Sequence, residues 1–357
     1  MRILYLTNMP APYRVEFFNQ LAAEVDLTVV YEQHSDGVRD DGWLSREKLR
    51  HEAVFLDDMV GGGGFSRLHA VRQQISQGEY NLVVVGCYNS RVGALTISWL
   101  KKSGRRYLVN VDGMFFPGEG VKKRIRDKIV AGADGYLIAG RSTGENLIQI
   151  ADNAPVFPYH FSSLTRKHIA NNRNAADSAK REGFVLCVGQ YEDYKGVDVL
   201  LEVSKLMPER AFVLVGSGRR APELCAVAED CSNVAILDFL DESSLGNLYL
   251  RCAVLVLPSR QECWGLVVNE ALSYGATVVS TWGSGAAVEL LGDIAPERLA
   301  RPGDAASLEK TLRNVLDCVP DRCRALDRRL RKRAEEYSIE TMVDDHMLAF
   351  SHFRSGV

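Results

Sequence analysis

Short, continuous apolar runs alternate along the first half of the chain with segments in which apolar residues recur at helical spacing. Runs rich in Val, Ile and Leu are typical of strands buried on both faces of a parallel sheet. The pattern therefore predicts strands at 2–8, 26–32, 81–86, 106–112 and 135–140. The amphipathic segments between them predict helices at 13–24, 66–77, 90–102 and 121–132.

The alternation stops at 171–183, "NNRNAADSAKREG", which is polar, lacks an apolar period and is predicted to be a linker. A second series of apolar runs then predicts strands at 184–189, 211–216, 234–237, 253–258 and 276–281, with helices between them. The last part of the chain, with "LEKTLRNVL" and "RALDRRLRKRAEEY" as charged amphipathic segments, is predicted to be helical.

Two successive α/β series of similar size predict two domains, each with a parallel sheet covered by helices. The predicted divisions are an N-terminal domain at 1–170, the linker, a C-terminal domain at 184–335, and a final helix at 336–357 that can pack back on the N-terminal domain. Parallel sheets of this kind bind ligands at the carboxyl ends of their strands. Two such domains facing each other would form a central cleft.

Composition narrows the class of protein. The 357 residues are 46% hydrophobic and 25% charged with a formal net charge of −3, which argues against a strongly basic nucleic-acid binder. No apolar run approaches the roughly 20 residues that span a bilayer, and the N-terminus lacks the features of a signal peptide. The eight cysteines form no C-x-x-C and have no His cluster at metal-ligand spacing. A reduced, cytoplasmic protein without a structural metal is expected.

The most informative stretch is "PSRQECWGLVVNEALSYGATVVS" (258–280), which follows an apolar run and contains Glu262 and Glu270. A helix is predicted to begin near Trp264 or Gly265, and its free N–H groups would suit a phosphate. Glu270 would then be placed to accept hydrogen bonds from ribose hydroxyls, and Glu262 to reach a sugar beyond the phosphates. Spacing alone leaves a second interpretation equally open, in which Glu262 complements the helix dipole and Glu270 is a solvated surface residue.

Two neighbouring loops carry weaker signals. In "FVLCVGQYEDYKGVDVLLE" (184–202), the predicted strand ends at Gly189 and Lys195 opens the next helix, where a lysine can neutralise phosphate. A solvated lysine would give the same local sequence. The Gly-rich turn in "VLVGSGRR" (213–220) contains Gly216 and Gly218, but a lone G-x-G is weak evidence.

Taken together, "VGQYEDYKG", "VGSG" and "PSRQECWGLVVNEALSYGATVV" resemble the pattern of glycosyltransferase family 4, whose members are retaining GT-B enzymes that use sugar nucleotides. The E-x7-E spacing from Glu262 to Glu270 is the sharpest element, and the resemblance is specific over 184–291. It implies two Rossmann-like domains and transfer of a sugar from a nucleotide donor to an acceptor hydroxyl. It implies no cofactor and no metal, and a role in bacterial polysaccharide or glycolipid assembly.

The resemblance also implies roles for single residues. Lys195 would contact the donor diphosphate, Glu270 would hold the ribose, and Glu262 would lie by the transferred sugar. The rest of the donor site would be formed by Gly189, Gln190, Gly216, Gly218, Trp264, Gly265, Leu266 and Val267. Gln190 is a departure, because the family usually has an arginine there; the candidates for a replacement cation are Arg14, Arg219 and Arg260.

The N-terminal half would supply the acceptor side. "TNMPAPYRVEFF" (7–18) forms a proline-stiffened loop after the first strand, and places Tyr13 and Arg14 there. Asp112, at the end of a predicted strand, is a catalytic candidate with a structural turn residue as the alternative. The family often has a histidine near this point and this chain does not. His160, in "PYHFSSL", is not expected to be catalytic.

A basic amphipathic segment, "VKKRIRDKIV" (121–130), raises the question of membrane contact. It suits an anionic membrane surface and a lipid-linked acceptor, while an ordinary packed helix with a solvated basic face is the simpler interpretation. "RRLRKR" (328–333) has a similar character, and "GGGG" (61–64) is predicted to be a flexible loop.

Two rival functions remain from the sequence. One is a GT-B epimerase or phosphorylase, which would turn over without an acceptor. The other is a catalytically weak nucleotide-sugar-binding subunit that recruits a partner glycosyltransferase to the membrane.

Overall fold

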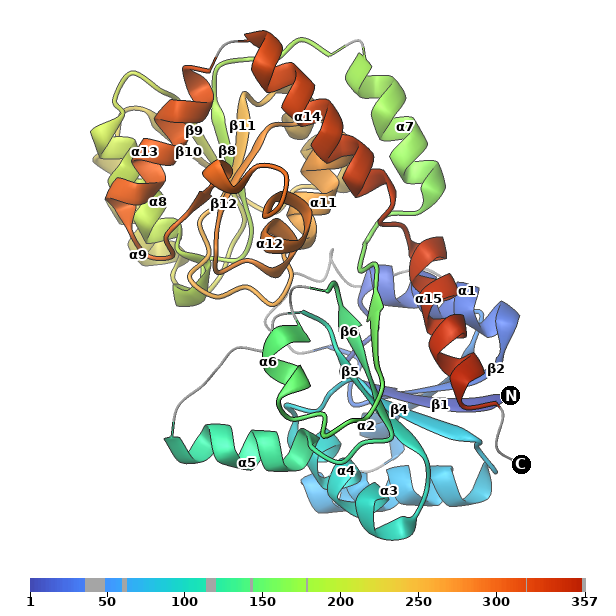
Figure 1. Ribbon diagram of the computed structural model, residues 1–357. Helices are drawn as coiled ribbons and strands as arrows, with labels where there is room; N and C mark the ends of the chain where they lie inside the picture. The colour runs from blue at the N-terminus through green and yellow to red at the C-terminus, as the bar shows by residue number, and fades with distance from the viewer. Residues whose placement is uncertain are drawn as a thin grey trace. The chain divides into compact units, whose positions relative to one another are not determined.

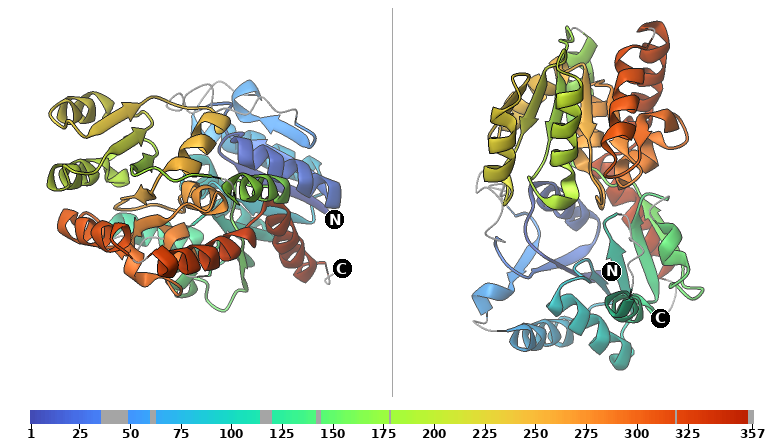
Figure 2. Two further views of the ribbon diagram at one scale, coloured as in Figure 1. Left: turned by 90° about the horizontal axis from the view of Figure 1, so that it is seen from above. Right: turned by 90° about the vertical axis from the view of Figure 1, so that its left-hand side faces the viewer.

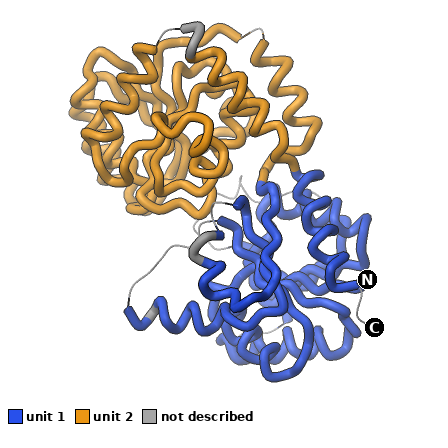
Figure 3. The backbone as a smooth tube through the Cα atoms, viewed as in Figure 1, with its two compact units in different colours: residues 1–161, 339–357 blue, residues 162–338 orange. Residues whose placement is uncertain are grey.

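The chain folds into two compact units, coloured separately in Figure 3. The computed structural model describes residues 1–35, 49–59, 63–113, 120–141, 144–177, 179–318 and 320–354. Unit 1 comprises Met1–Phe161 and Ile339–Val357, and unit 2 comprises Ser162–Ser338. Unit 1 is thus built from both ends of the chain. Two residues of the predicted Gly-rich loop, 61–62, lie outside the described residues.

Unit 1 contains a seven-stranded parallel sheet in the order β3-β2-β1-β4-β5-β6-β7 (Figure 1). Its strands are β1 (Arg2–Thr7), β2 (Asp26–Tyr31), β3 (Glu52–Phe55), β4 (Leu82–Val85), β5 (Tyr107–Val111), β6 (Gly135–Ala139) and β7 (Val156–Tyr159). Its helices are α1 (Pro12–Glu24), α2 (Leu56–Met59), α3 (Gly64–Gln77), α4 (Arg91–Ser103), α5 (Gly120–Val130), α6 (Glu145–Ile148) and α15 (Ile339–His352). The strand order reverses between β1 and β4, because β2 and β3 are added on one side of β1 and β4 to β7 on the other.

Unit 2 contains a six-stranded parallel sheet in the order β10-β9-β8-β11-β12-β13. Its strands are β8 (Val185–Val188), β9 (Phe212–Val215), β10 (Val234–Leu237), β11 (Val254–Leu257), β12 (Val278–Thr281) and β13 (Leu299–Ala300). Its helices are α7 (Arg166–Asp177), η3 (Asp193–Lys195), α8 (Val197–Leu206), α9 (Ala221–Glu229), α10 (Glu242–Arg251), α11 (Leu266–Ser273), α12 (Gly285–Leu291), η4 (Pro296–Arg298), α13 (Ala305–Leu316) and α14 (Pro320–Glu335).

Helices cover both faces of the unit 2 sheet (Figures 1 and 2). α8 packs with α13 on one face, and α11 packs with α12 and α14 on the other. The central strands β8 and β11 are buried along their whole length, which explains their continuous apolar sequence. The order of the strands reverses between β8 and β11.

The stretch predicted as a linker is largely helical. α7 begins after Thr165, whose Oγ1 accepts a hydrogen bond from the backbone N–H of His168, as an N-cap does. The helix buries only Ile169 and Asn172, and the Asn172 amide donates to Ser273 Oγ at 2.9 Å. Because so few positions of α7 are buried, its sequence shows no apolar period, and the prediction of a linker over 171–183 was wrong for residues up to 177.

Three short strands, β3, β7 and β13, were also absent from the predicted elements. β3 and β7 are only partly buried, so neither forms a continuous apolar run. β13 has two residues. At the C-terminus, α15 lies in unit 1, where it packs against α1 and β7.

The sequence predicted that all cysteines are reduced, and this is wrong for two of them. Cys318 and Cys323 form a disulfide between α13 and α14, at a spacing that the search for C-x-x-C does not detect. The other six cysteines form no disulfide, and four of them are buried. Among the helices that the structure describes, none combines the length and the apolar character needed to cross a bilayer.

Candidate functional site

The candidate site of unit 2 lies where the strand order reverses, at the carboxyl ends of β8 and β11. Sheets of this topology bind ligands at such a point, because the loops after the two strands diverge there. The β8 loop leads through Gly189 to η3 and Lys195, and the β11 loop leads through Glu262 to α11. A backbone hydrogen bond of 2.8 Å, from Arg260 N to Tyr194 O, ties the two loops together.

Lys195 and Glu262 form an ion pair at this point. The Lys195 ammonium donates to Glu262 Oε2, and the two side chains are 16% and 11% exposed. Removing one partner of such a shielded pair leaves an uncompensated charge. An ammonium group has three N–H donors, so Lys195 is able to hold Glu262 and a phosphate oxygen at once. The alternative interpretation, in which Lys195 is a solvated lysine, is therefore wrong.

Gly196 allows the turn that carries Lys195 to approach β11 closely. Its φ is 67°, in the left-handed region, and a Cβ at this position would overlap the carbonyl oxygen of Pro258. Gly216 and Gly218 have a similar role, since a Cβ at either would collide with the backbone of the β8 loop. These glycines therefore assemble the loops of the candidate site.

The start of α11 is arranged as an anion site. Gly265, with a φ of 99°, is its N-cap, and no side chain caps the helix there. The backbone N–H groups of Leu266 and Val267 therefore begin the helix without a capping oxygen, and such groups bind phosphate. The Trp264 indole is buried and donates to Asn269 Oδ1 at 2.9 Å, so this residue offers its backbone rather than its ring.

Glu270 lies one turn further along α11 and points into unit 2. Its carboxylate accepts hydrogen bonds from Ser163 Oγ at 2.9 Å and from Tyr249 Oη at 3.0 Å. Burial raises the pKa of Glu270, and the two hydrogen bonds oppose that shift. The alternative of a solvated surface residue does not hold. Ser163 and Tyr249 carry no local sequence signal, because they lie 107 and 21 residues away.

Replacing Glu270 by glutamine should raise the stability of the folded protein at neutral pH and at the same time abolish the binding of nucleotide sugars. Because the folded pKa is raised, the stability contributed by this group is complete below its ordinary pKa and is lost as pH rises through the folded value. At pH 7 the Gln variant, which has no charge to bury, should melt about 1–3 °C higher than the wild type. Its stabilisation by nucleotide sugars should disappear.

Melting curves between pH 4 and 7 check this result, with the exposed Glu202→Gln on α8 as the matched control. The wild type and Glu270→Gln should converge at the acidic end. A Gln variant that melts lower at pH 7 and keeps its nucleotide response would contradict the assignment.

Each cation proposed to replace the missing arginine at Gln190 has a carboxylate partner. Arg219 pairs with Glu192, Arg260 forms a two-pronged pair with Asp198, and Arg14 pairs with Asp112 within unit 1. Arg219 is the most accessible of the three, with 79% of its side chain exposed. It is therefore the best placed to turn toward an added anion.

The predicted acceptor-side residues of unit 1 lie together. Arg14 is 3% exposed, pairs with Asp112, and lies over the Tyr13 ring at 5.7 Å. Sequence patterns did not indicate Asn110 and Tyr159, which both donate to Asp112 Oδ1. His160 has a structural partner, since its Nδ1 lies 2.8 Å from Asp345 of α15.

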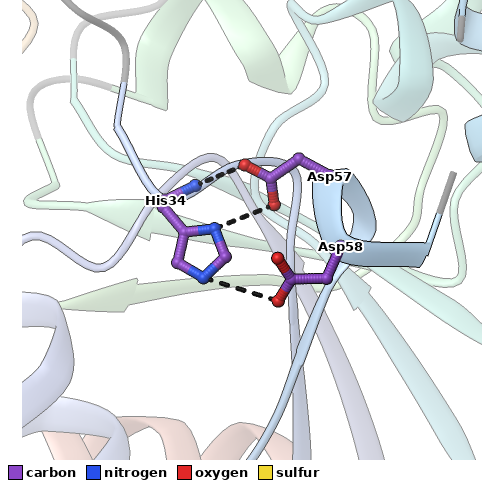
Figure 4. Close-up of side chains that lie close together, drawn as sticks. All are labelled: His34, Asp57 and Asp58. Carbon is purple, nitrogen blue, oxygen red and sulfur yellow. Dashed lines mark hydrogen bonds and ion pairs between the residues drawn. The ribbon is translucent and has the colours of Figure 1, made fainter. Parts of the chain in front are cut away.

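A second cluster at the carboxyl edge of unit 1 is formed by His34, Asp57 and Asp58 (Figure 4). The His34 ring lies 3.1 Å from Asp57 and 3.5 Å from Asp58 and stacks on Phe55. All three polar side chains are exposed, and their mutual pairing accounts for the arrangement without an ion. We assign no metal to it.

The C-terminal half of the chain is similar in sequence to known glycosyltransferases. Residues 168–337, almost all of unit 2, match the family described as glycosyl transferases group 1. A 2-deoxystreptamine glucosyltransferase from Streptomyces kanamyceticus is 31% identical over 137 residues, 36% of this chain and 35% of the relative. A D-inositol 3-phosphate glycosyltransferase from Xylanimonas cellulosilytica is 27% identical over 188 residues, 47% of this chain and 45% of the relative. The matches thus span less than half of these curated relatives.

The fold is similar to that of solved glycosyltransferases over the whole chain. Sucrose-phosphate synthase from Thermosynechococcus elongatus superposes with a TM-score of 0.77 at 16% identity, covering 99% of this chain and 98% of that one. Anabaena HepE, solved with UDP and glucose, superposes with a TM-score of 0.73 at 16% identity, covering 98% and 99%. These likenesses confirm the predicted GT-B fold, with two parallel-sheet α/β domains.

Proposed function

We propose that the chain is a retaining glycosyltransferase that moves a sugar from a nucleotide donor to an acceptor hydroxyl. The observation that carries the proposal is the Lys195–Glu262 pair beside the uncapped start of α11, at the strand-order reversal of unit 2. Glu270 lies on the same helix, where it suits a ribose. HepE, whose fold is similar, has been solved with UDP-glucose, which supports a donor of this class.

In the proposed reaction the bond between the anomeric carbon and the diphosphate oxygen breaks, and the acceptor oxygen bonds to that carbon. Lys195 and the amides that begin α11 stabilise the charge on the departing diphosphate. The acceptor's proton passes to the leaving phosphate on the same face, which gives retention without a protein nucleophile. We propose no metal requirement and no cofactor, because these cationic and N–H groups supply the countercharge.

The proposed setting is the assembly of a bacterial polysaccharide or glycolipid. An O-antigen chain mannosyltransferase from Escherichia coli is 25% identical over 158 residues, which supports a glycan or lipid-linked acceptor. The proposed location is the cytoplasm, with peripheral contact at the inner face of the membrane.

Helix α5 supports that contact. Val121 and Ile125, one turn apart, are 71% and 55% exposed, whereas Ile129 packs against the core of unit 1. An ordinary packed helix would bury all three. The exposed Arg124 and Lys128 border this pair on the helix, and an apolar face bordered by basic residues suits an anionic membrane surface.

Replacing Val121 and Ile125 together by serine should lower binding to anionic lipid vesicles by about 10-fold, because the apolar contact is lost. Co-sedimentation with vesicles of phosphatidylglycerol and phosphatidylcholine measures the effect. Leu348→Ser, at an exposed leucine of α15, a helix without Lys or Arg, is the control and should bind as the wild type does. Equal losses in both variants would count against α5.

A transfer assay tests the function itself. The protein is incubated with UDP-, GDP- and dTDP-sugars and octyl glycosides as acceptors, and proton NMR identifies the anomer of the product. The proposal predicts release of nucleoside diphosphate that depends on the acceptor, with retention. Inversion would contradict the mechanism, turnover without acceptor would favour an epimerase or phosphorylase, and nucleotide binding without turnover would favour a binding subunit.

A further inference from the structure

Beneath the predicted acceptor side, unit 1 contains a buried polar cluster, here called the Arg14 cluster. Its members come from β1, α1, β5, β7 and α15, and they are Tyr5, Arg14, Asn110, Tyr159 and His346. Each is no more than 3% exposed. Its neighbour Asp112, which pairs with Arg14, has a side chain that is 34% exposed. A partly exposed carboxylate therefore lies at the edge of the cluster.

The hydrogen bonds to Asp112 leave it one acceptor position. Oδ1 accepts from the Asn110 amide and from Tyr159 Oη, and Oδ2 accepts from Arg14. A carboxylate has about two lone-pair positions on each oxygen. Oδ1 is thus saturated, and Oδ2 keeps one position, on a side chain that is 34% exposed.

Four atoms of the Arg14 cluster are buried without a hydrogen-bond partner among the described residues. Two are donors, Arg14 Nη1 and Tyr5 Oη, and one is an acceptor, Asn110 Oδ1. The fourth is His346 Nε2. Burial lowers the pKa of His346 to about 4, and its Nδ1 lies 2.7 Å from Met342 O, so the neutral ring donates there and Nε2 is an acceptor. The polar atoms of the cluster are therefore not all satisfied by one another.

Such a cluster is a costly way to fill a core, because a buried ion pair is often no more stable than apolar side chains of the same size. Its geometry instead fixes the direction of Asp112. The guanidinium charge is compensated and enclosed, so no charge of Arg14 is free for an anionic ligand. The group that reaches the surface is the Asp112 carboxylate, which can only accept hydrogen bonds.

We propose that Arg14 is a positioning residue, which with Asn110 and Tyr159 holds the free lone pair of Asp112 toward a hydroxyl or amino group of the acceptor sugar. The proposal rests on the proposed function and names the chemistry of its acceptor. The acceptor group next to Asp112 donates a hydrogen bond, and a phosphate or carboxylate at this point is repelled. His346 of α15 packs against the Tyr159 ring at 4.7 Å, so a helix from the C-terminal end of the chain also helps to hold this arrangement.

Steady-state kinetics of a double-mutant cycle test this coupling, with octyl glycosides as the acceptor probes and glucose 6-phosphate as the anionic probe. Asp112→Asn and Arg14→Met should each lower kcat/KM for the octyl glycoside by about 10- to 100-fold, the effect of one hydrogen bond to a charged group. The double variant should be no worse than Asp112→Asn alone, because Arg14 acts through Asp112. The double variant also removes the unpaired Asp112 charge that could destabilise the single Arg14 variant. The KM for the donor should stay unchanged throughout.

The control is Tyr136→Phe, which removes a buried hydroxyl of unit 1 that donates to Val130 O, outside the Arg14 cluster, and should leave the acceptor KM within about twofold. Additive losses in the double variant, or equal effects on donor and acceptor KM, would overturn the proposal. Transfer to glucose 6-phosphate in preference to every octyl glycoside would overturn it as well. Failure of the proposed function looks different, since the wild type would then show neither nucleotide-dependent stabilisation nor transfer.

Discussion

Replacing Lys195 by alanine should lower kcat for sugar transfer by about 10²- to 10³-fold, the usual effect of removing one group that stabilises developing charge. Lys195 is the cation paired with Glu262 at the β8–β11 site, whereas Arg219 and Arg260 are paired with other carboxylates. Gln190 adds no charge, and Arg219 would have to leave Glu192 to compensate for the lost lysine. Initial rates with saturating donor and acceptor measure the loss.

The same substitution leaves Glu262 without its lysine and should also lower stability. Glu262→Gln combined with Lys195→Met should restore the melting temperature, because no unpaired charge remains, but not the activity. Lys205→Ala, at an exposed lysine on α8, is the matched control and should behave as the wild type. A Lys195→Ala enzyme with near-normal kcat would remove Lys195 from the mechanism.

Gly196→Ala should be strongly damaging, although it adds a single methyl group. The new Cβ would overlap the Pro258 carbonyl oxygen, and it would occupy a left-handed conformation, φ 67°. The η3 turn would have to move away from β11 and would carry Lys195 away from Glu262. We expect a melting temperature about 5–15 °C lower and loss of the nucleotide response, since overpacking and backbone strain add.

Gly104→Ala separates the two causes. Gly104 has nearly the same φ, 69°, but nothing lies within 4 Å of its Cβ position. It should cost only the left-handed strain, about 1–2 kcal/mol. Calorimetry on both variants makes the comparison, and equal shifts would mean that the contact with Pro258 is unimportant.

The sequence predicted those parts of the structure that depend on local patterns. β8 and β11 are buried on both faces, so their apolar runs are continuous. The loops of the candidate site in unit 2 could be predicted from their glycines and from the spacing of Glu262 and Glu270, because residues on one strand-turn-helix unit keep a fixed relation. α7 was missed because its contact with the core is narrow.

Contacts between distant segments could not be predicted in this way. Asp112 is 98 residues from Arg14, and Glu270 is 107 residues from Ser163. Periodicity places a residue on a face of its own element but does not select its partner on another element. The Arg14 cluster, which combines both ends of the chain, is therefore visible only in the folded structure.

The central claim is that unit 2 binds a nucleotide sugar through Lys195 and Glu270. The most direct test is thermal shift with UDP-, GDP- and dTDP-sugars, on the wild type beside Lys195→Ala and Glu270→Ala. The account predicts that one nucleotide class raises the melting temperature of the wild type and that both substitutions abolish the rise. No stabilisation of the wild type by any of these donors, or an equal rise in both variants, would contradict it.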